Sequence, residues 1–480
     1  MTGYKSTSEP AWCEEHNVPE AACIECRVGL VPKVTDYGWC KVHGVAQCPL
    51  EHPDIAQLNQ PPQIEKANFE RAERALAAMP RSENNSRCKL HENRIQFASI
   101  AAIDKAGVDI AVASEQPVME AVSANGEIIY DETRSAHLAS RLGGTIWRVD
   151  KQVNNTVRKS DVLALIDAAQ VGQAKAEFLK GLAQLQLNTT TVERLKPLMA
   201  SGGIPGRQFR EAEAALKQAQ IQLLSAQQTL VNLGLPVDTE KISNLSTEEL
   251  ADEMRLLGLP KEIVAELDHQ PVTSNLLPVR SPLSGIVVNR HAVAGEVVQN
   301  TQTLFEVSDI SHMWLMLDVR QEDARLVFDG QTVLFRPTSD AREAEIRGRV
   351  VWISTAIDER TRTVKVRADL PNPDGRIRAN TFGAGRLVVR EEPRAVVVPV
   401  EAVHTDGCCS VVFVRDKNYL QADSPKFFHI RKVRLGMKEH DAAEIIAGVL
   451  PGEVVASKGS IILEAQLLKS KLGEGCGCSK

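Results

Sequence analysis

A repeated pattern of glycine and apolar residues constrains this 480-residue chain more than any other feature. In each copy, apolar residues follow the glycine at offsets of 2, 13, 19 and 22 positions. The copies are Gly144, Ile146, Val157, Leu163 and Ile166, and Gly285, Val287, Val298, Leu304 and Val307. Because neither half could bury its apolar face alone, the repeat predicts one β-sandwich made of two halves. The alternative is a loose alternation of Val and Ile that any two β segments share.

The stretch between the two copies has the spacing of an antiparallel coiled-coil hairpin over residues 168–236. Two long helical patterns flank the Gly-rich segment Pro197–Gly206, and the second pattern ends at Gly234. Seam positions recur at three- and four-residue intervals, which is typical of a coiled coil. At 1.5 Å per residue, each arm would be roughly 40 Å long. The seam residues are Phe178, Leu182, Leu185, Thr189 and Val192 in the first helix, and Phe209, Ala212, Leu216, Ala219, Leu223, Ala226, Leu230 and Leu233 in the second.

The rest of the chain predicts a multidomain α+β protein that is mostly β. Its length exceeds one ordinary core, and short runs of Val, Ile and Ala between turn residues indicate strands. Ser246 before Glu248 and Glu249 is a capping signal for a helical insert after the hairpin. The expected divisions are a Cys/His-rich module (1–60), a linker (61–95), two β domains (96–116 with 396–466, and 117–137 with 309–395), the sandwich (138–167 with 279–308), the helical insert (237–278) and a flexible Cys-Gly tail (467–480).

Composition argues against two classes of partner. The formal net charge of −6 provides no global basic field for nucleic acid. No apolar stretch approaches the length that a bilayer-spanning helix needs. The segment Met1–Pro10 is polar and lacks the apolar region of a signal peptide.

Five of the ten cysteines lie within the first 50 residues, in a segment that repeats a Trp-Cys-x-x-His motif. Cys-x-x-His and Cys-x-x-Cys spacings let two side chains from one turn reach a single ion. Zn²⁺ or Cu⁺ suits thiolate and imidazole ligands best. The predicted metal ligands are Cys13, His16, Cys23 and Cys26 in the first copy, and Cys40, His43, Cys48 and His52 in the second.

Several alternatives stay open for this module. The cysteines could form disulfides in an oxidising compartment, which would abolish metal binding. Disulfides alone, however, would not explain a histidine three residues after the cysteine in each copy. The two copies could bind separate ions or share one, and the metal could be structural or in transit. Cys476 and Cys478 in the Gly-rich tail are a weaker candidate site for a soft metal.

Ordered motifs between about residues 95 and 465 resemble the HlyD-like periplasmic adaptors, or membrane fusion proteins, of RND-type efflux systems, especially their heavy-metal branch. The motifs are Val279–Val287, Gly295–Val298, Leu304–Asp309, Thr361–Pro373, Val398–Val403 and Gly448–Val455. The resemblance implies that the split sandwich is lipoyl-like. It also implies that residues 117–137 join 309–395 in a β-barrel, and that residues 96–116 join 396–466 in a membrane-proximal domain.

The resemblance further implies a non-enzymatic function, with no catalytic residues and no organic cofactor. Such an adaptor would link an inner-membrane RND pump to an outer-membrane channel, in the periplasm and attached to the inner membrane. It would self-associate into rings and support the efflux of heavy-metal cations. Many adaptors carry an Arg, a Leu and a Ser at the hairpin tip, and the matching residues here are Arg194, Leu198 and Pro205. Pro197 is expected to end or kink the first helix.

Two other functions remain open. The chain could be an adaptor for organic compounds or protein secretion with a purely structural zinc module, or a cytosolic metal-binding scaffold. A lipoyl or biotin carrier is disfavoured because carriers present a modified lysine on a tight turn between the two halves. Here a long helical insertion occupies that place.

Overall fold

The computed structural model describes residues 11–469, apart from 15, 28, 32–34, 61, 244, 268–272, 339–344, 407–408, 423 and 440. From residue 470 onward the predicted Cys-Gly tail, with Cys476 and Cys478, lies outside the described residues. The chain divides into two compact units. The first comprises residues 1–125, 317–366 and 383–480, and the second comprises 126–316 and 367–382.

The second unit contains a β-sandwich built from both copies of the repeated pattern. One sheet has the strand order β10-β13-β15-β8 and the other β12-β11-β9-β14, so each sheet takes two strands from each half. All eight apolar residues of the repeat are buried. The predicted split sandwich is confirmed, since neither half supplies a complete sheet. The strands are β8 (Ser135–Ala139), β9 (Gly144–Val149), β10 (Thr156–Val157), β11 (Val162–Asp167), β12 (Leu276–Arg280), β13 (Gly285–Arg290), β14 (Val297–Val298) and β15 (Thr303–Ser308).

The glycine that opens each copy is required by a close approach of two strands. A Cβ at Gly144 would lie 2.4 Å from the carbonyl oxygen of Asp167. A Cβ at Gly285 would lie 2.4 Å from the carbonyl oxygen of Ser308, which occupies the equivalent position in the second copy. Any larger residue would therefore push β9 away from β11, or β13 away from β15.

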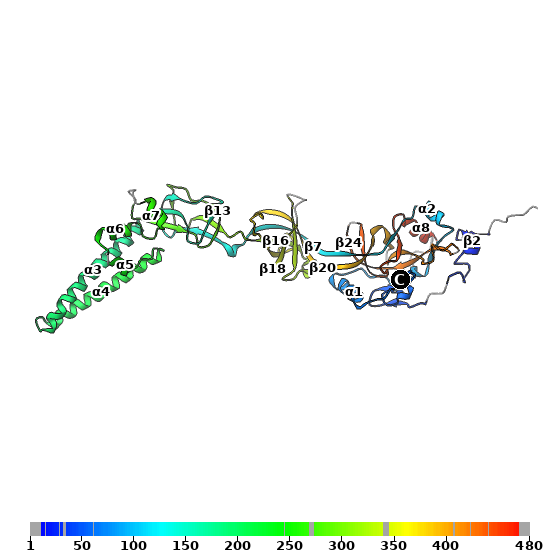
Figure 1. Ribbon diagram of the computed structural model, residues 1–480, viewed down its shortest axis with the longest axis horizontal. Coiled ribbons are helices and arrows are strands. Elements are labelled where there is room, and N and C mark those ends of the chain that lie inside the picture. Colours follow the sequence, from blue (N-terminus) through cyan, green and yellow to red (C-terminus); the bar gives the residue numbers. More distant parts are fainter. Residues whose placement is uncertain are drawn as a thin grey trace, which may run out of the picture. The chain divides into compact units, whose positions relative to one another are not determined.

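Helices α3 (Ala169–Ala200) and α4 (Gly206–Asn232) lie side by side as a hairpin inserted between β11 and β12 (Figure 1). Near the sandwich, the seam residues Phe178, Leu182 and Leu223 are buried. Pro197 does not end the first helix, which continues to Ala200. Proline cannot donate to the carbonyl four residues earlier, so one helix hydrogen bond is lost, but the helix ends within one further turn, and Gly202 follows at φ +72°.

The predicted helical insert after the hairpin contains the short helices α5 (Thr239–Ser243), α6 (Thr247–Arg255) and α7 (Lys261–Leu267). The predicted capping signal is present, because Ser246 and Glu249 exchange side chain–backbone hydrogen bonds at the start of α6. Met254 and Leu257 extend the sandwich core. The insert also covers Lys175, whose ammonium group donates to the carbonyl of Arg255 at 3.1 Å. Burial lowers the pKa of Lys175 to about 8.

Six strands form a closed barrel in the order β17-β18-β19-β16-β7-β20, and pairing of β17 with β20 closes the ring. The early strand β7 therefore joins late strands, as the family resemblance implies. The final residues of β20, Val397–Pro399, pair with β25 of the C-terminal domain. The bounds are β7 (Ser114–Tyr130), β16 (His312–Arg320), β17 (Thr332–Pro337), β18 (Ile346–Ile357), β19 (Thr363–Pro371) and β20 (Thr381–Pro399).

The C-terminal β domain, in the first unit, also joins early and late segments. Strand β5 pairs with β23, and β6 pairs with β26, which is the pairing expected for a membrane-proximal domain. The predicted fold class, multidomain and mostly β, is confirmed. The elements are β5 (Arg94–Phe97), α2 (Ile100–Ala106), β6 (Ile110–Val112), β21 (His404–Asp406), β22 (Cys409–Arg415), β23 (Lys426–Lys432), β24 (Arg434–Glu439), β25 (Ala442–Ala447), β26 (Val454–Ala456) and α8 (Ile461–Lys469).

Residues 61–95, expected to form a linker, instead fold onto this domain. Helix α1 (Lys66–Ala78) buries Ala72 and Ala75 in a core that includes Ile446 and Ala447 of β25. After the helix, the Asn84 side chain donates to the carbonyls of Gly44 (3.2 Å) and Val433 (2.9 Å). The helical pattern of residues 64–79 is visible in the sequence, but its packing is not, because the residues that it contacts in β25 lie far along the chain.

Candidate metal centres

Two Cys/His clusters lie in the N-terminal part of the first unit, each built around one short hairpin. In each hairpin, the residue four positions after the cysteine donates its N–H to the cysteine carbonyl. The donors are Asn17 to Cys13 (2.8 Å) and Gly44 to Cys40 (2.9 Å), and both have left-handed backbones. This turn brings the histidine of each motif beside its first cysteine. The hairpins are β1 (Trp12–Cys13) with β2 (Val18–Pro19), and β3 (Trp39–Cys40) with β4 (Val45–Ala46).

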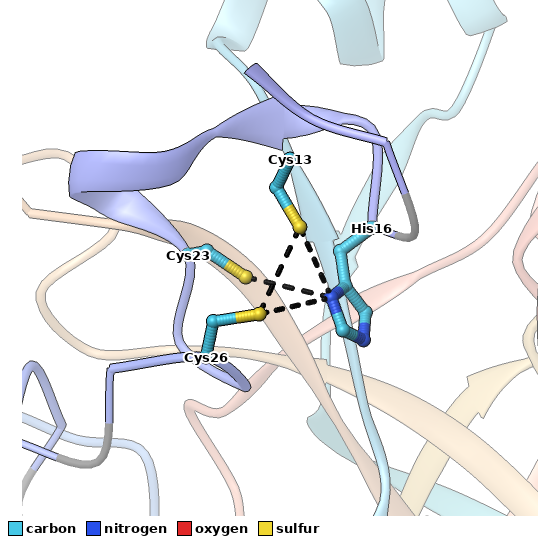
Figure 2. Close-up of side chains that lie close together, drawn as sticks. All are labelled: Cys13, His16, Cys23 and Cys26. Carbon is cyan, nitrogen blue, oxygen red and sulfur yellow. Dashed lines mark hydrogen bonds between the residues drawn. The ribbon is translucent and has the colours of Figure 1, made fainter. Parts of the chain in front are cut away.

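The first cluster contains all four predicted ligands, Cys13, His16, Cys23 and Cys26 (Figure 2). His16 Nδ1 lies 3.4 Å from the sulfur of Cys13 and 3.6 Å from each of the other two sulfurs. The sulfurs of Cys13 and Cys26 are 3.8 Å apart. Four ligand atoms thus converge around one central point.

These separations fit a tetrahedral metal site. With Zn–S near 2.3 Å and Zn–N near 2.0 Å, ligand atoms around zinc lie roughly 3.8 Å apart for two sulfurs and roughly 3.6 Å apart for sulfur and nitrogen. A disulfide would require about 2.05 Å between the sulfurs. The donor set of three cysteines and one histidine therefore suits a thiophilic ion such as Zn²⁺ or Cu⁺.

Backbone amides support the Cys23-x-x-Cys26 turn. Burial alone would raise the pKa of Cys23, but hydrogen bonds from the N–H groups of Cys26 and Glu25 and from neighbouring thiols lower it overall. The Cys26 thiol is exposed, and its hydrogen bonds to Cys23 and Cys13 raise its pKa to about 12. The turn thus lowers the pKa of Cys23 while that of Cys26 is raised.

The second cluster contains three of its four predicted ligands, Cys40, His43 and Cys48. His43 Nδ1 lies 3.4 Å from the sulfur of Cys40 and 3.5 Å from that of Cys48. The structure does not bring His52 to this point. Its ring stacks on Tyr37, with 3.7 Å between centroids and 5° between planes. The carboxylate of Glu51 lies closer, with Oε1 3.5 Å from His43 Nδ1.

Burial dominates the electrostatics of the second cluster. Desolvation raises the pKa of the Cys48 thiol to about 12, although the N–H groups of Glu51 and Leu50 oppose the shift. Burial also lowers the pKa of His43, which is 1% exposed. A neutral imidazole is the form that binds a metal ion.

The surroundings of the second cluster are part of a larger core. Val45, Cys48 and Leu50 pack with α1 and with Ile446 and Ala447 of β25. Arg431 donates to the carbonyl of Ile55 at 3.1 Å, which attaches the following turn to β23. This half of the module is therefore integrated into the C-terminal β domain rather than appended to it.

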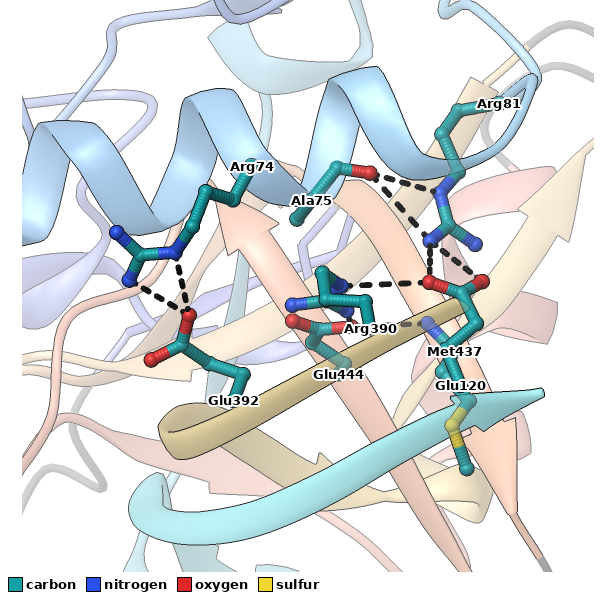
Figure 3. A network of polar contacts seen from close by, with 8 residues as sticks. All are labelled: Arg74, Ala75, Arg81, Glu120, Arg390, Glu392, Met437 and Glu444. Atoms are coloured by element: carbon teal, nitrogen blue, oxygen red, sulfur yellow. Dashed lines mark hydrogen bonds and ion pairs between the residues drawn. The ribbon is translucent and has the colours of Figure 1, made fainter. Parts of the chain in front are cut away.

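A network of ion pairs connects α1 and the residues just after it to β7, β20 and β25 (Figure 3). Arg390 of β20 pairs with Glu120 of β7 at 3.3 Å and with Glu444 of β25 at 2.5 Å. All three side chains are almost fully buried. Arg81, just beyond α1, pairs with the same Glu120 at 2.6 Å, and Arg74 of α1 pairs with Glu392 at 2.8 Å.

The predicted partner-binding residues of the hairpin tip are all exposed. Arg194 and Leu198 lie in the last turns of α3, and Leu198 is 44% exposed. Pro205 directly precedes α4. The tip thus offers an arginine, a leucine and a proline at the surface, in place of the frequent arginine, leucine and serine.

Three family descriptions match consecutive parts of the chain. Residues 134–309 match a CzcB-like barrel-sandwich hybrid domain, residues 312–390 a CusB-like β-barrel domain, and residues 396–464 a CzcB C-terminal circularly permuted SH3-like domain. This order of domains, with a helical hairpin inserted in the first, defines a membrane fusion protein. The chain belongs to this family of periplasmic adaptors, with CzcB-like domains, and the predicted family is confirmed.

The relatives are of moderate identity. The cobalt-zinc-cadmium resistance protein CzcB of Cupriavidus metallidurans is 28% identical over 389 residues, which cover 81% of this chain and 66% of CzcB. The nickel-cobalt-cadmium resistance protein NccB of Alcaligenes xylosoxydans xylosoxydans is 24% identical, covering 70% of this chain and 73% of NccB. The crystal structure of ZneB from Cupriavidus metallidurans aligns with a TM-score of 0.33 and 24% identity, covering 76% of this chain and 95% of ZneB. Among the described residues, no helix combines the length and apolarity of a bilayer-spanning segment.

Proposed function

We propose that this chain is a periplasmic, non-enzymatic adaptor that links an inner-membrane RND transporter to an outer-membrane channel and supports the export of heavy-metal cations. The main support for this function is the domain architecture, in which a split sandwich with an inserted hairpin is combined with the barrel and the C-terminal β domain. Separate domains and an exposed helical tip suit a connector between partners.

Two observations support a metal cation as the exported substrate. Relatives such as CzcB and NccB are named for resistance to cobalt, zinc, cadmium and nickel. The chain also carries two Cys/His clusters with metal-ligand spacing. We propose that these clusters bind Zn²⁺ or Cu⁺, since thiolate and imidazole are their donors.

The proposed assembly includes rings of this chain, with the hairpin tip meeting the channel. The exposed side chains of Arg194 and Leu198 and the exposed Pro205 support the tip as a contact surface. An exposed leucine at the end of a hairpin provides apolar area that a partner can bury.

Growth of a strain that lacks the gene tests this function. Deletion should increase sensitivity to zinc, cobalt, cadmium or nickel, and the unaltered gene should restore resistance. A Leu198→Asp chain should fold normally but fail to restore resistance. Leu187→Asp, at a more exposed site of α3 away from the tip (61% against 44% exposed), should restore it. If only dyes and detergents become toxic, the substrate is organic and the metal proposal fails. If the protein fractionates with the cytosol, the adaptor proposal fails.

A further inference from the structure

The sequence prediction pairs Cys48 with His52, four residues later. The two Cys/His repeats can instead be aligned so that their fourth ligand positions have the same spacing. In the first repeat, Cys26 follows Cys23 by three residues. In the second repeat, the residue three positions after Cys48 is Glu51, whereas His52 is four positions after it. The aligned motifs are therefore Cys-x-x-Cys and Cys-x-x-Glu.

The backbone follows this alignment closely. The sulfur of Cys23 accepts hydrogen bonds from the N–H groups of the residues two and three positions later, and the sulfur of Cys48 does the same. In both turns the next N–H returns to the cysteine carbonyl, at 3.1 Å from Arg27 and at 2.9 Å from His52. Glu51 thus occupies the turn position of Cys26.

The side chain of Glu51 reaches the imidazole of this cluster, although its carboxylate is not one of the three groups whose ligand atoms all lie close together. Its Oε1 lies 3.5 Å from His43 Nδ1, and the Cys26 sulfur lies 3.6 Å from His16 Nδ1. The nitrogen that faces Glu51 is the same atom that faces the two sulfurs of its cluster. Nitrogen and oxygen ligands of a tetrahedral zinc ion are separated by roughly 3.4 Å, which agrees with this contact.

We propose that the second cluster is a Cys₂HisGlu site for a divalent cation, in which Glu51 is the fourth ligand in place of Cys26. This inference rests on the proposed metal binding and specifies its chemistry. Glu51 is the solvent-facing ligand, with a side chain that is 39% exposed, whereas His43 and Cys48 are buried. The exposed position in the first cluster belongs to Cys26.

Because one site would have a thiolate where the other has a carboxylate, the two sites should prefer different metal ions. Soft Cu⁺ favours sulfur, and carboxylate oxygen favours harder divalent ions. The Cys₃His cluster therefore accepts Cu⁺ and Zn²⁺, whereas the Cys₂HisGlu cluster favours Zn²⁺ and Co²⁺ over Cu⁺. The second site is then matched to divalent ions and the first to thiophilic ions.

Titration of the full chain with Co²⁺ under reducing conditions tests the assignment. The intensity of sulfur-to-cobalt charge-transfer absorption increases with the number of thiolate ligands. The background carries Cys13→Ser and Cys23→Ser to inactivate the first cluster, and Cys476→Ser and Cys478→Ser to remove the tail thiols. In this background, absorption should correspond to two thiolates, and competition with Zn²⁺ gives the zinc affinity.

Three single changes in this background separate the ligands. Glu51→Gln should weaken Zn²⁺ and Co²⁺ binding by roughly tenfold or more. Glu51→Cys should raise the charge-transfer absorption to the three-thiolate level and increase affinity for Cu⁺. His52→Ala should leave both affinities unchanged.

The outcomes distinguish this inference from the proposed metal binding. If the background shows no charge-transfer band, the second cluster binds no metal and both proposals fail there. If the band is present but Glu51→Gln leaves the affinity unchanged, metal binding stands and the Glu51 assignment is overturned. A tenfold loss with His52→Ala would instead restore the histidine as the fourth ligand.

Discussion

The two Cys/His clusters share one turn design but differ in what surrounds them. The first cluster packs mainly on itself, with Cys13, Val18 and Cys23 forming a small separate core. The second contributes Val45 and Cys48 to a core that it shares with α1 and β25. The same sequence motif therefore produces a peripheral candidate metal site in one copy and a structural element of a β domain in the other.

This difference shows that the ligands do not determine how far metal binding is coupled to folding. Binding energy at a site contributes to the stability of whatever structure orders its ligands. At the first cluster, that structure is a short loop. At the second cluster, it includes α1 and the C-terminal β domain, so loss of metal should affect the whole first unit.

The largest expected effect follows from replacing Cys48, the buried cysteine of the second cluster that begins its Cys-x-x-Glu turn. Cys48→Ser removes a ligand and a buried thiol from the shared core, and it should lower the stability of the first unit by roughly 4 kcal/mol. Cys23→Ser is the matched control, because it is equally buried but in the small core. Cys23→Ser should lower the free energy of unfolding of the first unit by less than about 1 kcal/mol. Differential scanning calorimetry of the zinc-loaded chains measures both changes.

A chelator provides the same comparison without mutation. EDTA should lower the main unfolding temperature of the unaltered chain and of Cys23→Ser, but it should have little further effect on Cys48→Ser. Equal shifts from Cys23→Ser and Cys48→Ser would show that the two sites are coupled to folding to the same extent, which would contradict the comparison.

An intermediate effect is expected from the ion-pair network that connects α1 to β7, β20 and β25. Arg390→Met leaves the carboxylates of Glu120 and Glu444 without their shared buried partner, and it should cost about 3 kcal/mol. Arg386→Met, on the same strand, is the control, because its pair with Glu345 is partly exposed. That control should cost less than about 1 kcal/mol. Urea unfolding measures both values.

The same variants show whether the network supports one cluster or both. Arg390→Met should speed the release of metal from the second cluster and leave release from the first cluster unchanged. Equal acceleration at both clusters would contradict the selective role of α1 and its network.

Much of the fold could be predicted because its determinants are local or periodic. The offsets after Gly144 and Gly285 specified the sandwich, since each apolar position must face one shared core. The seam in α4 specified a hairpin because heptad spacing is visible in a single helix. The packing of α1 was missed because the contacts of Ala72 and Ala75 come from β25, far along the chain.

The candidate site was predictable to the same degree. Seven of the predicted ligands lie in the two clusters, because a turn of fixed length places Cys and His side by side whatever surrounds them. The placement of His52 failed to follow from spacing, since one residue around the turn directs its ring towards Tyr37. Spacing alone could not exclude His52, because the position of its ring depends on the stacking contact with Tyr37, which the motif does not encode.

The smallest expected effect concerns Gln96, which connects the first cluster to β5. Its side chain donates to the carbonyl of Ala22 at 2.7 Å and accepts from the N–H of Ile24 at 3.1 Å. Gln96→Ala removes both bonds, which together stabilise the loop by about 1–2 kcal/mol. Amide hydrogen exchange in residues 16–27 should therefore become roughly tenfold faster, while the main unfolding transition stays unchanged. Because β5 belongs to the C-terminal β domain, a large global destabilisation by Gln96→Ala would mean that the first cluster is as firmly integrated as the second.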